Sequence, residues 1–430
     1  MLKTYWTFCG RSADALAISV LLMASAAASG AEQLYTNQPA ITPSLAQAGE
    51  WPVGVRTITL DNPNQLDAND LPNVTTRRLV IEMWYPAVHA SGAGRAEYRD
   101  VTRLHKPFTV LGDAWRDAAP AEGESFPLVV LSHGYTGYRT IMYYLGEHLA
   151  SHGYVVASID HPDSTNAAID FVNNRGAGFA STLLHRARDQ QFVLDTIAEL
   201  DSPVAAIADA ERASVIGYSM GGYGAVNVVG GCYRYTREIV LSFGVPEAAA
   251  DALVPVYSGC SAWRDGVDPR WKAMVAFAPW GQTRGVHDLG GVELPSLFIA
   301  GEEDDVSGFA DGVRNLYEQA ASDDKYLLVY EGARHNIAPH PAPSVAYESA
   351  DDLGHYAEPA WSVEQLNRIN KHMVLAFLDC HVKAADERCE YLPRREMATQ
   401  VRGGDGQLSE PWPGFGDRWA TGMRFYRGSN

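Results

Sequence analysis

The residues Gly217-Tyr218-Ser219-Met220-Gly221 follow the apolar run Ala213-Ser214-Val215-Ile216 and open a segment of small residues. A Gly-x-Ser-x-Gly pattern between a strand and a helix is typical of a tight, strained turn, in which larger side chains at the glycines would collide. Such a turn exposes the serine oxygen at the N-terminus of the helix, where the helix dipole favours a developing negative charge. The pattern therefore predicts that Ser219 is a nucleophile and that the backbone N–H of Met220 stabilises an oxyanion.

Near-continuous apolar runs recur on both sides of this turn and alternate with segments of helical periodicity. Such runs are typical of parallel strands buried on both faces, and their alternation with helices predicts a doubly wound, mostly parallel α/β sheet. Strands are expected at residues 128–131, 155–159, 214–216, 274–278, 297–300 and 326–330. Helices are expected at residues 140–152, 182–200, 220–229, 308–320 and 363–380.

Three further segments complete the expected domain, which covers residues 32–393. Alternating apolar and polar residues at 51–60 and 77–85 predict an antiparallel edge on the N-terminal side of the sheet. The insertion at 231–271 is longer than a usual helix-to-strand connection and predicts a cap near the site. Residues 394–430, rich in Gly, Trp, Pro and Arg, are expected to form an irregular tail.

A serine needs a base and a group that orients the base, in the chain order Ser, Asp or Glu, then His. The strand at 297–300 leads into an acidic turn, and the strand at 326–330 leads into His335. Catalytic groups in open α/β sheets gather at such strand ends. His335 is therefore the expected general base and Asp304 the expected acid, with Asp305 as the main alternative.

A second oxyanion donor should come from the loop after an earlier strand. The loop Ser132-His133-Gly134-Tyr135-Thr136-Gly137 follows the strand at 128–131, and its Gly134 lets the backbone approach a substrate. The Tyr135 N–H is the expected donor, and His133 is expected to hold the loop.

The N-terminus, from Met1 to about Ala31, combines basic residues, an apolar run and small residues, which predicts a secretory signal peptide. The apolar run is shorter than the ~20 residues that a spanning helix needs. We therefore expect a secreted or periplasmic protein with no membrane span after cleavage of this segment.

Export would allow disulfides to persist. Two sequence-local pairs, Cys232 with Cys260 and Cys380 with Cys389, are the simplest of the three possible connectivities. No cysteine has the spacing of a metal ligand, so no metal or other cofactor is expected. The formal net charge of −18 disfavours binding to nucleic acid or anionic lipid through a basic surface. A monomer is the default expectation.

The stretches Leu131–Arg139 and Leu149–Ala157 resemble the platelet-activating-factor acetylhydrolase family and bacterial dienelactone-hydrolase-like esterases. The resemblance extends through Trp84-Tyr85-Pro86, Asp160–Ser164, His185–Asp189 and the serine turn to His335. It implies an α/β-hydrolase fold and a serine esterase that acts on short or modified acyl groups.

Two departures qualify the resemblance. The acetylhydrolases carry their acid one strand after the nucleophile, where this chain has Ala276-Phe277-Ala278-Pro279-Trp280 and no carboxylate. An acid placed after a later strand, at Asp304, and the Ala-Pro-Trp sequence both resemble bacterial polyester hydrolases and cutinases. That resemblance implies that Tyr135 and Trp280 flank the bound acyl group. Dienelactone hydrolases proper use a cysteine nucleophile, and Ser219 argues against that chemistry.

The sequence thus predicts a secreted serine hydrolase that cleaves carboxylic esters of small-molecule, lipid or polymer substrates. A cutinase-like polyester hydrolase is the alternative with the same chemistry. A peptidase or acyltransferase on the same fold also stays open, because specificity depends on the pocket rather than on the fold. A binding protein without catalysis is disfavoured, because the serine turn, base, acid and oxyanion loop are all present.

Overall fold

The computed structural model describes residues 30–88, 94–259, 266–281 and 287–428. The predicted signal peptide, residues 1–31, lies almost entirely outside the described residues and stays a prediction.

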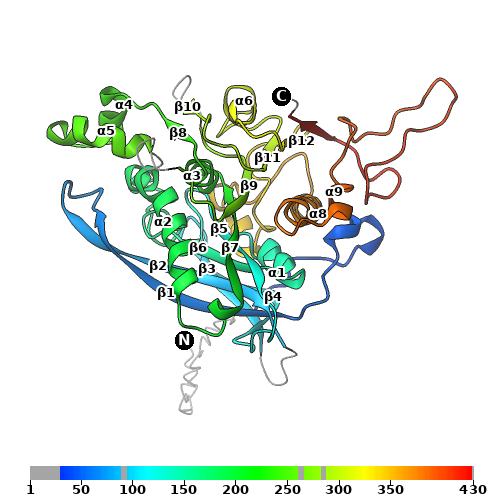
Figure 1. The fold of residues 1–430 in the computed structure, drawn as a ribbon, viewed down its shortest axis with the longest axis horizontal. Coiled ribbons are helices and arrows are strands. Elements are labelled where there is room, and N and C mark those ends of the chain that lie inside the picture. Colours follow the sequence, from blue (N-terminus) through cyan, green and yellow to red (C-terminus); the bar gives the residue numbers. More distant parts are fainter. Residues whose placement is uncertain (1–29, 89–93, 260–265, 282–286, 429–430) are drawn as a thin grey trace, which may run out of the picture.

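One sheet of eleven strands forms the centre of the molecule, in the order β13-β12-β11-β9-β7-β5-β6-β2-β1-β4-β3 (Figure 1). The six strands from β12 to β6 are parallel to one another, and they contain the six apolar runs predicted as parallel strands, apart from Ala278, which lies just after β9. The strands are β1 (Val53–Leu66), β2 (Val74–Pro86), β3 (Arg95–Val101), β4 (Pro107–Arg116), β5 (Phe126–Ser132), β6 (Val155–Asp160), β7 (Ala208–Tyr218), β9 (Trp271–Phe277), β11 (Ser296–Gly301), β12 (Lys325–Tyr330) and β13 (Met423–Arg427), and β8 (Cys232–Tyr233) pairs separately with β10 (His287–Asp288).

Helices cover both faces of this sheet, as a doubly wound fold requires (Figure 1). On one face, α1 and α8 contribute Leu149 and Met373 to a core of buried residues. On the other face, α2, α3 and α6 contribute Val193, Val226 and Leu316 to a second core. The helices are α1 (Tyr143–Ser151), α2 (Phe179–Glu199), α3 (Met220–Val228), α4 (Arg237–Ser242), α5 (Ala250–Ser258), α6 (Arg314–Gln319), α7 (Ala350–Leu353), α8 (Val363–His381) and α9 (Asp386–Cys389).

Pairing on the N-terminal side of the sheet is mostly antiparallel, as predicted, because β2 pairs antiparallel with both β1 and β6, whereas β1 and β4 pair in parallel. Two strands there were not predicted, β3 and β4, which pair antiparallel with each other at the edge. Along β3 the side chains alternate between exposed and buried. Its buried residues are few and separated by charged ones, so this strand lacks the continuous apolar run that marks the central strands.

The expectation of an irregular tail at 394–430 is wrong for Met423–Arg427. These residues form β13, which pairs antiparallel with β12 and extends the central sheet. Met423 and Phe425 face the core, and Phe425 stacks on Tyr326 at a ring-centroid distance of 5.7 Å. A strand of five residues with two basic side chains gave too weak an apolar pattern to be predicted.

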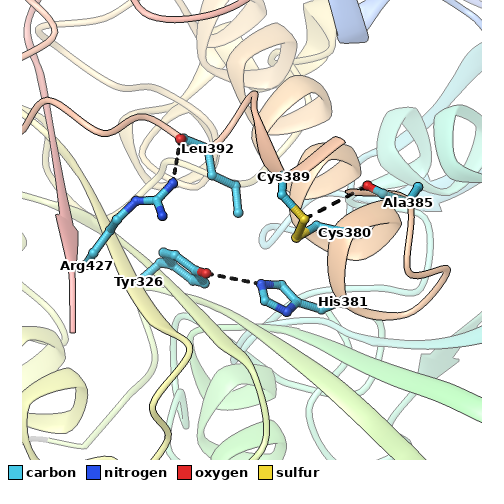
Figure 2. The surroundings of a disulfide bond; sticks show 7 residues. All are labelled: Tyr326, Cys380, His381, Ala385, Cys389, Leu392 and Arg427. Carbon is cyan, nitrogen blue, oxygen red and sulfur yellow. Dashed lines mark hydrogen bonds between the residues drawn. A yellow bond between two sulfur atoms is a disulfide. The ribbon is translucent and has the colours of Figure 1, made fainter. Parts of the chain in front are cut away.

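The predicted disulfide between Cys380 and Cys389 is present and joins the end of α8 to α9 (Figure 2). Just beyond α9, the carbonyl oxygen of Leu392 accepts a hydrogen bond of 2.6 Å from Arg427 of β13. The bridge therefore lies where the C-terminal segment leaves α8 and passes toward the edge of the sheet.

The insertion at 231–271 contains β8, α4 and α5. Helix α4 begins after Thr236, whose hydroxyl accepts a hydrogen bond from the Ile239 N–H, and α5 ends at Gly259, which adopts a left-handed conformation with φ of 75°. Cys260 lies outside the described residues, so its pairing with Cys232 stays a prediction. No described helix is both long and apolar enough to cross a membrane.

Replacing both Cys380 and Cys389 by serine should lower the free energy of unfolding by about 2–3 kcal/mol, because the bridge closes a short loop in the unfolded chain. Urea denaturation of the oxidised proteins measures this change. Cys389→Ser alone should be destabilised to a similar extent, and an unchanged denaturation midpoint in both variants would contradict the prediction.

Candidate active site

Ser219 lies at the turn between β7 and α3 in a strained backbone conformation, with φ of 54° and ψ of −114°. A Cβ at Gly217 would lie 2.1 Å from the carbonyl oxygen of Gly221, and a Cβ at Gly221 would lie 2.1 Å from that of Ser132. Only glycine fits at either position without moving the backbone. The two glycines of the sequence pattern therefore permit the close packing that presents Ser219.

The structure brings Ser219, His335 and Asp304 together from three separate loops. The Ser219 Oγ lies 3.0 Å from His335 Nε2, and both Asp304 carboxylate oxygens lie 3.0 Å from His335 Nδ1. All three residues are buried. This arrangement lets the imidazole accept the serine proton at Nε2 while its other nitrogen donates to the carboxylate.

Asp304 is held as an ion and in a fixed orientation. Burial raises the pKa of this carboxyl, but the charge of His335 and hydrogen bonds to the carboxylate outweigh it, so the pKa is lowered from its usual value. The backbone N–H groups of Val306 and Ser307 donate to Asp304 Oδ1 at 2.9 Å and 2.8 Å. The ionised carboxylate can therefore stabilise an imidazolium on His335.

Asp305, the alternative acid, points elsewhere. Its carboxylate pairs with the side chain of Arg334, and both side chains are about half exposed. Of the two aspartates, the structure therefore places only Asp304 in contact with His335.

The expected oxyanion donors lie on either side of Ser219. Met220 is the first residue of α3, and the first N–H groups of a helix have no acceptor within the helix. A Cβ on Gly134 would lie 3.2 Å from the Ser219 Cβ, so the loop that carries Tyr135 approaches the serine closely. The loop and the start of α3 thus both lie next to Ser219, and the role of the Tyr135 and Met220 N–H groups as oxyanion donors stays a prediction.

Arg186, on α2, holds this loop from beneath. Its guanidinium is fully buried and donates to the carbonyl oxygens of His133 and Gly134, at 2.6 Å and 3.2 Å. The His133 ring fixes the same segment, because Nδ1 lies 2.6 Å from the Gly134 carbonyl oxygen and Nε2 accepts from the His161 N–H. The expectation that His133 holds the loop agrees with these contacts.

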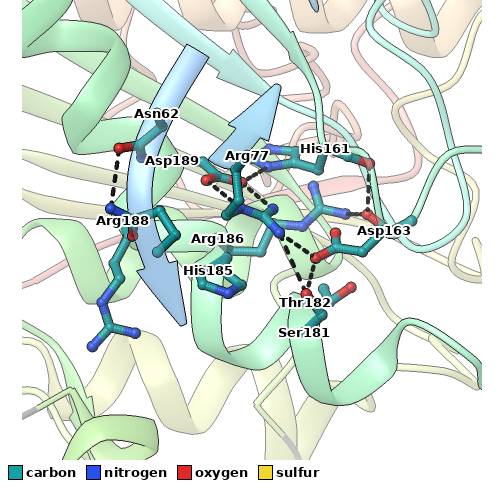
Figure 3. Close-up of polar contacts among 12 residues, drawn as sticks. Asn62, Arg77, His161, Asp163, Ser181, Thr182, His185, Arg186, Arg188 and Asp189 are labelled. Carbon is teal, nitrogen blue, oxygen red and sulfur yellow. Dashed lines mark hydrogen bonds and ion pairs between the residues drawn. The ribbon is translucent and has the colours of Figure 1, made fainter. Parts of the chain in front are cut away.

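A buried ion network extends from Arg186 to the antiparallel edge of the sheet (Figure 3). Arg77 of β2 makes two hydrogen bonds to Asp189 of α2, at 3.0 Å and 2.8 Å, and a third of 2.9 Å to Asp163. Asp189 also contacts His161 Nδ1 at 2.8 Å, and His161 Nε2 contacts the Ser132 hydroxyl at the same distance. The network thus connects β2, α2 and the end of β5.

Opposing effects set the charges in this network. Burial raises the pKa of Asp189, but Arg77 and His161 overcome it and hold that pKa far below its usual value. Burial, together with the charge of Arg186, lowers the pKa of His161 to about 4. His161 is therefore neutral near pH 7, and its ring bridges the Ser132 hydroxyl and the Asp189 carboxylate.

Sequence reasoning did not assign a role to Arg77, His161, Arg186 or Asp189. Three of them lie within the stretches Asp160–Ser164 and His185–Asp189, which carried the resemblance to the acetylhydrolases. Charged residues on a helix normally face solvent, so only the resemblance could have signalled that these side chains are buried.

A cluster of aromatic side chains lies next to the serine turn, and of its members Tyr135 also lines the cavity at Ser219. The Phe179 ring packs edge-on against both Tyr135 and Trp280, at centroid distances of 5.9 Å and 5.6 Å, and also contacts Phe243 near α4 of the insertion. The Trp280 N–H donates to the Ser219 carbonyl oxygen at 3.1 Å, which fixes this tryptophan next to the serine turn. Phe243 of the insertion therefore packs on the Phe179 ring, and the expected role of the insertion as a cap stays a prediction.

A cavity of about 250 Å³ opens at Ser219 and His335, lined also by Gly134, Tyr135 and residues of the segments around 103, 305 and 355. Among the described residues, no cluster of three or more His, Cys, Asp or Glu side chains is placed to hold a metal ion.

Replacing Arg186 by methionine should lower the free energy of unfolding by about 2–5 kcal/mol, because it leaves the buried carbonyl oxygen of His133 without a donor and unbalances the acidic network. Thermal or urea denaturation measures this loss. Arg188→Met is the matched control, since Arg188 donates to Leu184 within its own helix, and it should change stability by less than about 1 kcal/mol. Equal effects of the two substitutions would contradict the assigned role of Arg186.

Comparison with known proteins agrees with this geometry. The family described as PET hydrolase-like (PETase) matches residues 119–231, which span the oxyanion loop and the serine turn. Cutinase est2 of Thermobifida alba is 27% identical over 218 residues, which are 50% of this chain and 55% of that protein. A platelet-activating factor acetylhydrolase of Canis lupus familiaris is 44% identical over 55 residues, 13% of this chain and 12% of that protein.

The matched region covers less than two thirds of the length of the cutinases found. A solved structure, a ferulic acid esterase from Streptomyces cinnamoneus, matches with a TM-score of 0.53 and 21% identity, over 78% of this chain and 92% of that chain. This likeness concerns the fold. The chain has the α/β-hydrolase fold, and its sequence is similar to those of PET hydrolase-like proteins, cutinases and platelet-activating factor acetylhydrolase.

Proposed function

We propose that this protein hydrolyses carboxylic esters through an acyl-enzyme on Ser219. The observation that carries the proposal is the unbroken series of hydrogen bonds from Ser219 Oγ through the two nitrogens of His335 to Asp304, each 3.0 Å long. The similarity to cutinases and to an acetylhydrolase supports ester substrates.

In the first half of the reaction, Ser219 Oγ attacks the ester carbonyl carbon as His335 Nε2 takes the serine proton. The carbonyl electron pair moves onto the oxygen, and the N–H groups of Tyr135 and Met220 stabilise the resulting oxyanion. When the tetrahedral species collapses, the bond to the alcohol oxygen breaks and His335 gives its proton to the departing alcohol.

In the second half, water replaces the alcohol. His335 takes one proton from the water as its oxygen attacks the acyl carbon, and the second oxyanion forms between the same two donors. Collapse breaks the bond to Ser219 Oγ, returns the proton to the serine and releases the carboxylic acid. Asp304 stays ionised throughout and stabilises the imidazolium in both halves.

We further propose that the acyl part lies between Tyr135 and Trp280. Phe179 joins these two rings into one apolar wall, which suits a short acyl group or one unit of a polyester chain. A cutinase-like activity on polyesters uses the same wall and the same triad, and the similarity to cutinases and PET hydrolase-like proteins favours it equally.

The proposal places the enzyme outside the cytosol. The residues from Met1 to about Ala31 have the pattern of a signal peptide. The disulfide between Cys380 and Cys389 is consistent with an oxidising compartment.

Hydrolysis of 4-nitrophenyl esters with acyl chains of increasing length tests the reaction. The wild type should turn these esters over, and Ser219→Ala should lower kcat by roughly 10⁴- to 10⁶-fold. A release of alcohol that continues unchanged in Ser219→Ala would contradict the proposal. Parallel incubation with an aliphatic polyester film then separates a cutinase-like activity from one restricted to small esters.

The two aspartates offer a matched pair of variants. Asp304→Asn should lower kcat by roughly 10³- to 10⁴-fold, because an amide cannot stabilise the imidazolium on His335. Asp305→Asn removes only an exposed ion pair with Arg334 and should leave kcat within about threefold of the wild type. The opposite order of effects would move the acid to Asp305.

A further inference from the structure

The loop between β3 and β4 contributes Arg103 to the cavity at Ser219. Arg103 lines this space together with Ser219, His335 and Tyr135, although it lies far from them in the sequence. Nothing in the proposed ester hydrolysis uses a cation at this place, because the oxyanion is stabilised by backbone N–H groups.

The Arg103 guanidinium has few contacts within the protein. Its Nε lies 3.4 Å from the Thr136 hydroxyl, which is a long hydrogen bond, and the group stacks on the Phe171 ring at 4.7 Å. No carboxylate in the described part of the chain lies within ion-pair distance of it. Burial lowers the pKa of Arg103, and Asp351 acts on it only as a more distant charge. An arginine nevertheless stays cationic.

Four other enclosed arginines of this chain have closer partners than Arg103, which are carboxylates for Arg77 and Arg139 and backbone carbonyl oxygens for Arg186 and Arg188. Arg77 contacts two aspartates, and Arg139 contacts Glu82 and Asp160. A desolvated cation without a counter-ion is costly. An anion that enters the cavity would therefore pair with Arg103 and offset the cost of burying its charge.

The other charged and titratable groups around the cavity do not supply that anion. Arg334 and Asp305 neutralise each other, and Arg175 adds a second cation stacked on Phe171. His355 is 1% exposed and lies next to the Thr136 backbone, and no described side chain is hydrogen-bonded to its ring. Burial, together with the charge of Arg103, lowers the pKa of His355 well below its usual value, so its ring is neutral and can donate.

We propose that Arg103 binds a carboxylate group of the substrate, and that the protein acts on esters carrying a free carboxylate near the scissile bond. The inference rests on the proposed ester hydrolysis and narrows its substrate class. Monoesters of dicarboxylic acids and acyl esters of hydroxybenzoic acids have this chemistry. The chain as a whole carries a net charge of −18. An unpaired cation in the cavity that contains Ser219 therefore points to an anionic substrate.

The shape of the Arg103 guanidinium favours a carboxylate as the bound anion. A guanidinium presents parallel N–H donors that match the two oxygens of a carboxylate, and such charge-assisted pairs are stronger than neutral hydrogen bonds. A cavity of about 250 Å³ is small for a ligand site, so the carboxylate and the scissile carbonyl must lie within a few bonds of each other.

Two pairs of substrates test the inference with the whole protein. The first pair is the mono-4-nitrophenyl ester of adipic acid and 4-nitrophenyl hexanoate, which differ by a carboxylate on the acyl side. The second is 4-acetoxybenzoate and phenyl acetate, which differ by a carboxylate on the alcohol side. For at least one pair, the ratio of kcat/KM for the anionic ester to that for the neutral ester should fall roughly 10- to 100-fold in Arg103→Gln.

Two further variants separate binding by Arg103 from a general effect of charge. Arg103→Lys keeps the cation but not the paired donors and should recover part of the ratio. Arg175→Gln removes a cation from the same Phe171 ring and should leave the ratio unchanged. Circular dichroism establishes that each variant is folded.

A ratio that is equal in the wild type and Arg103→Gln for both pairs overturns the inference and leaves ester hydrolysis standing. A wild type that cleaves none of the four esters overturns both. If Arg103→Gln does not fold, inhibition of the wild type decides: benzoate should inhibit hydrolysis of 4-nitrophenyl hexanoate competitively and more strongly than benzamide, and equal inhibition overturns the inference.

Discussion

The backbone conformation of Ser219 is the constraint on which the rest of the site depends. A non-glycine residue with φ of 54° costs on the order of 1–3 kcal/mol and persists only when its surroundings hold it. Here the Ser219 N–H donates to the Phe277 carbonyl, and the Ser219 carbonyl accepts from Trp280. The strands β7 and β9 thus hold the turn in place, Gly217 lets the turn pack closely on Gly221, and Gly221 lets the end of β5 approach. Ser219 reaches His335 only while this packing is intact.

The same packing explains why charged groups are buried beneath the site. The loop after β5 must lie against Ser219, and its carbonyl oxygens need donors where water is excluded. Arg186 supplies them, and Asp189 and Asp163 balance its charge together with that of Arg77. A buried network of this kind contributes less to net stability than to holding one arrangement. Its far end is β2, so the antiparallel edge of the sheet contributes to the position of the loop that carries Tyr135.

The sequence predicts most of the fold, because parallel strands buried on both faces leave continuous apolar runs and the serine turn needs its glycines. It indicates Ser219 through the turn motif and His335 through chain order, and it favours Asp304 while leaving Asp305 open, since only the direction of each side chain decides. The strands β3 and β13 escape prediction because their apolar residues are few and interleaved with charges. Arg103 escapes it as well, because a lone arginine in a loop shows nothing of the cavity that it enters.

Covalent labelling with a fluorophosphonate tests the central claim most directly, since only a serine activated by its neighbours reacts rapidly at neutral pH. Intact mass and peptide mapping of the native protein should show one adduct, on Ser219, and the adduct should form far more slowly in His335→Gln. No adduct on the folded wild type, an adduct on another serine, or equal labelling of His335→Gln would contradict the account.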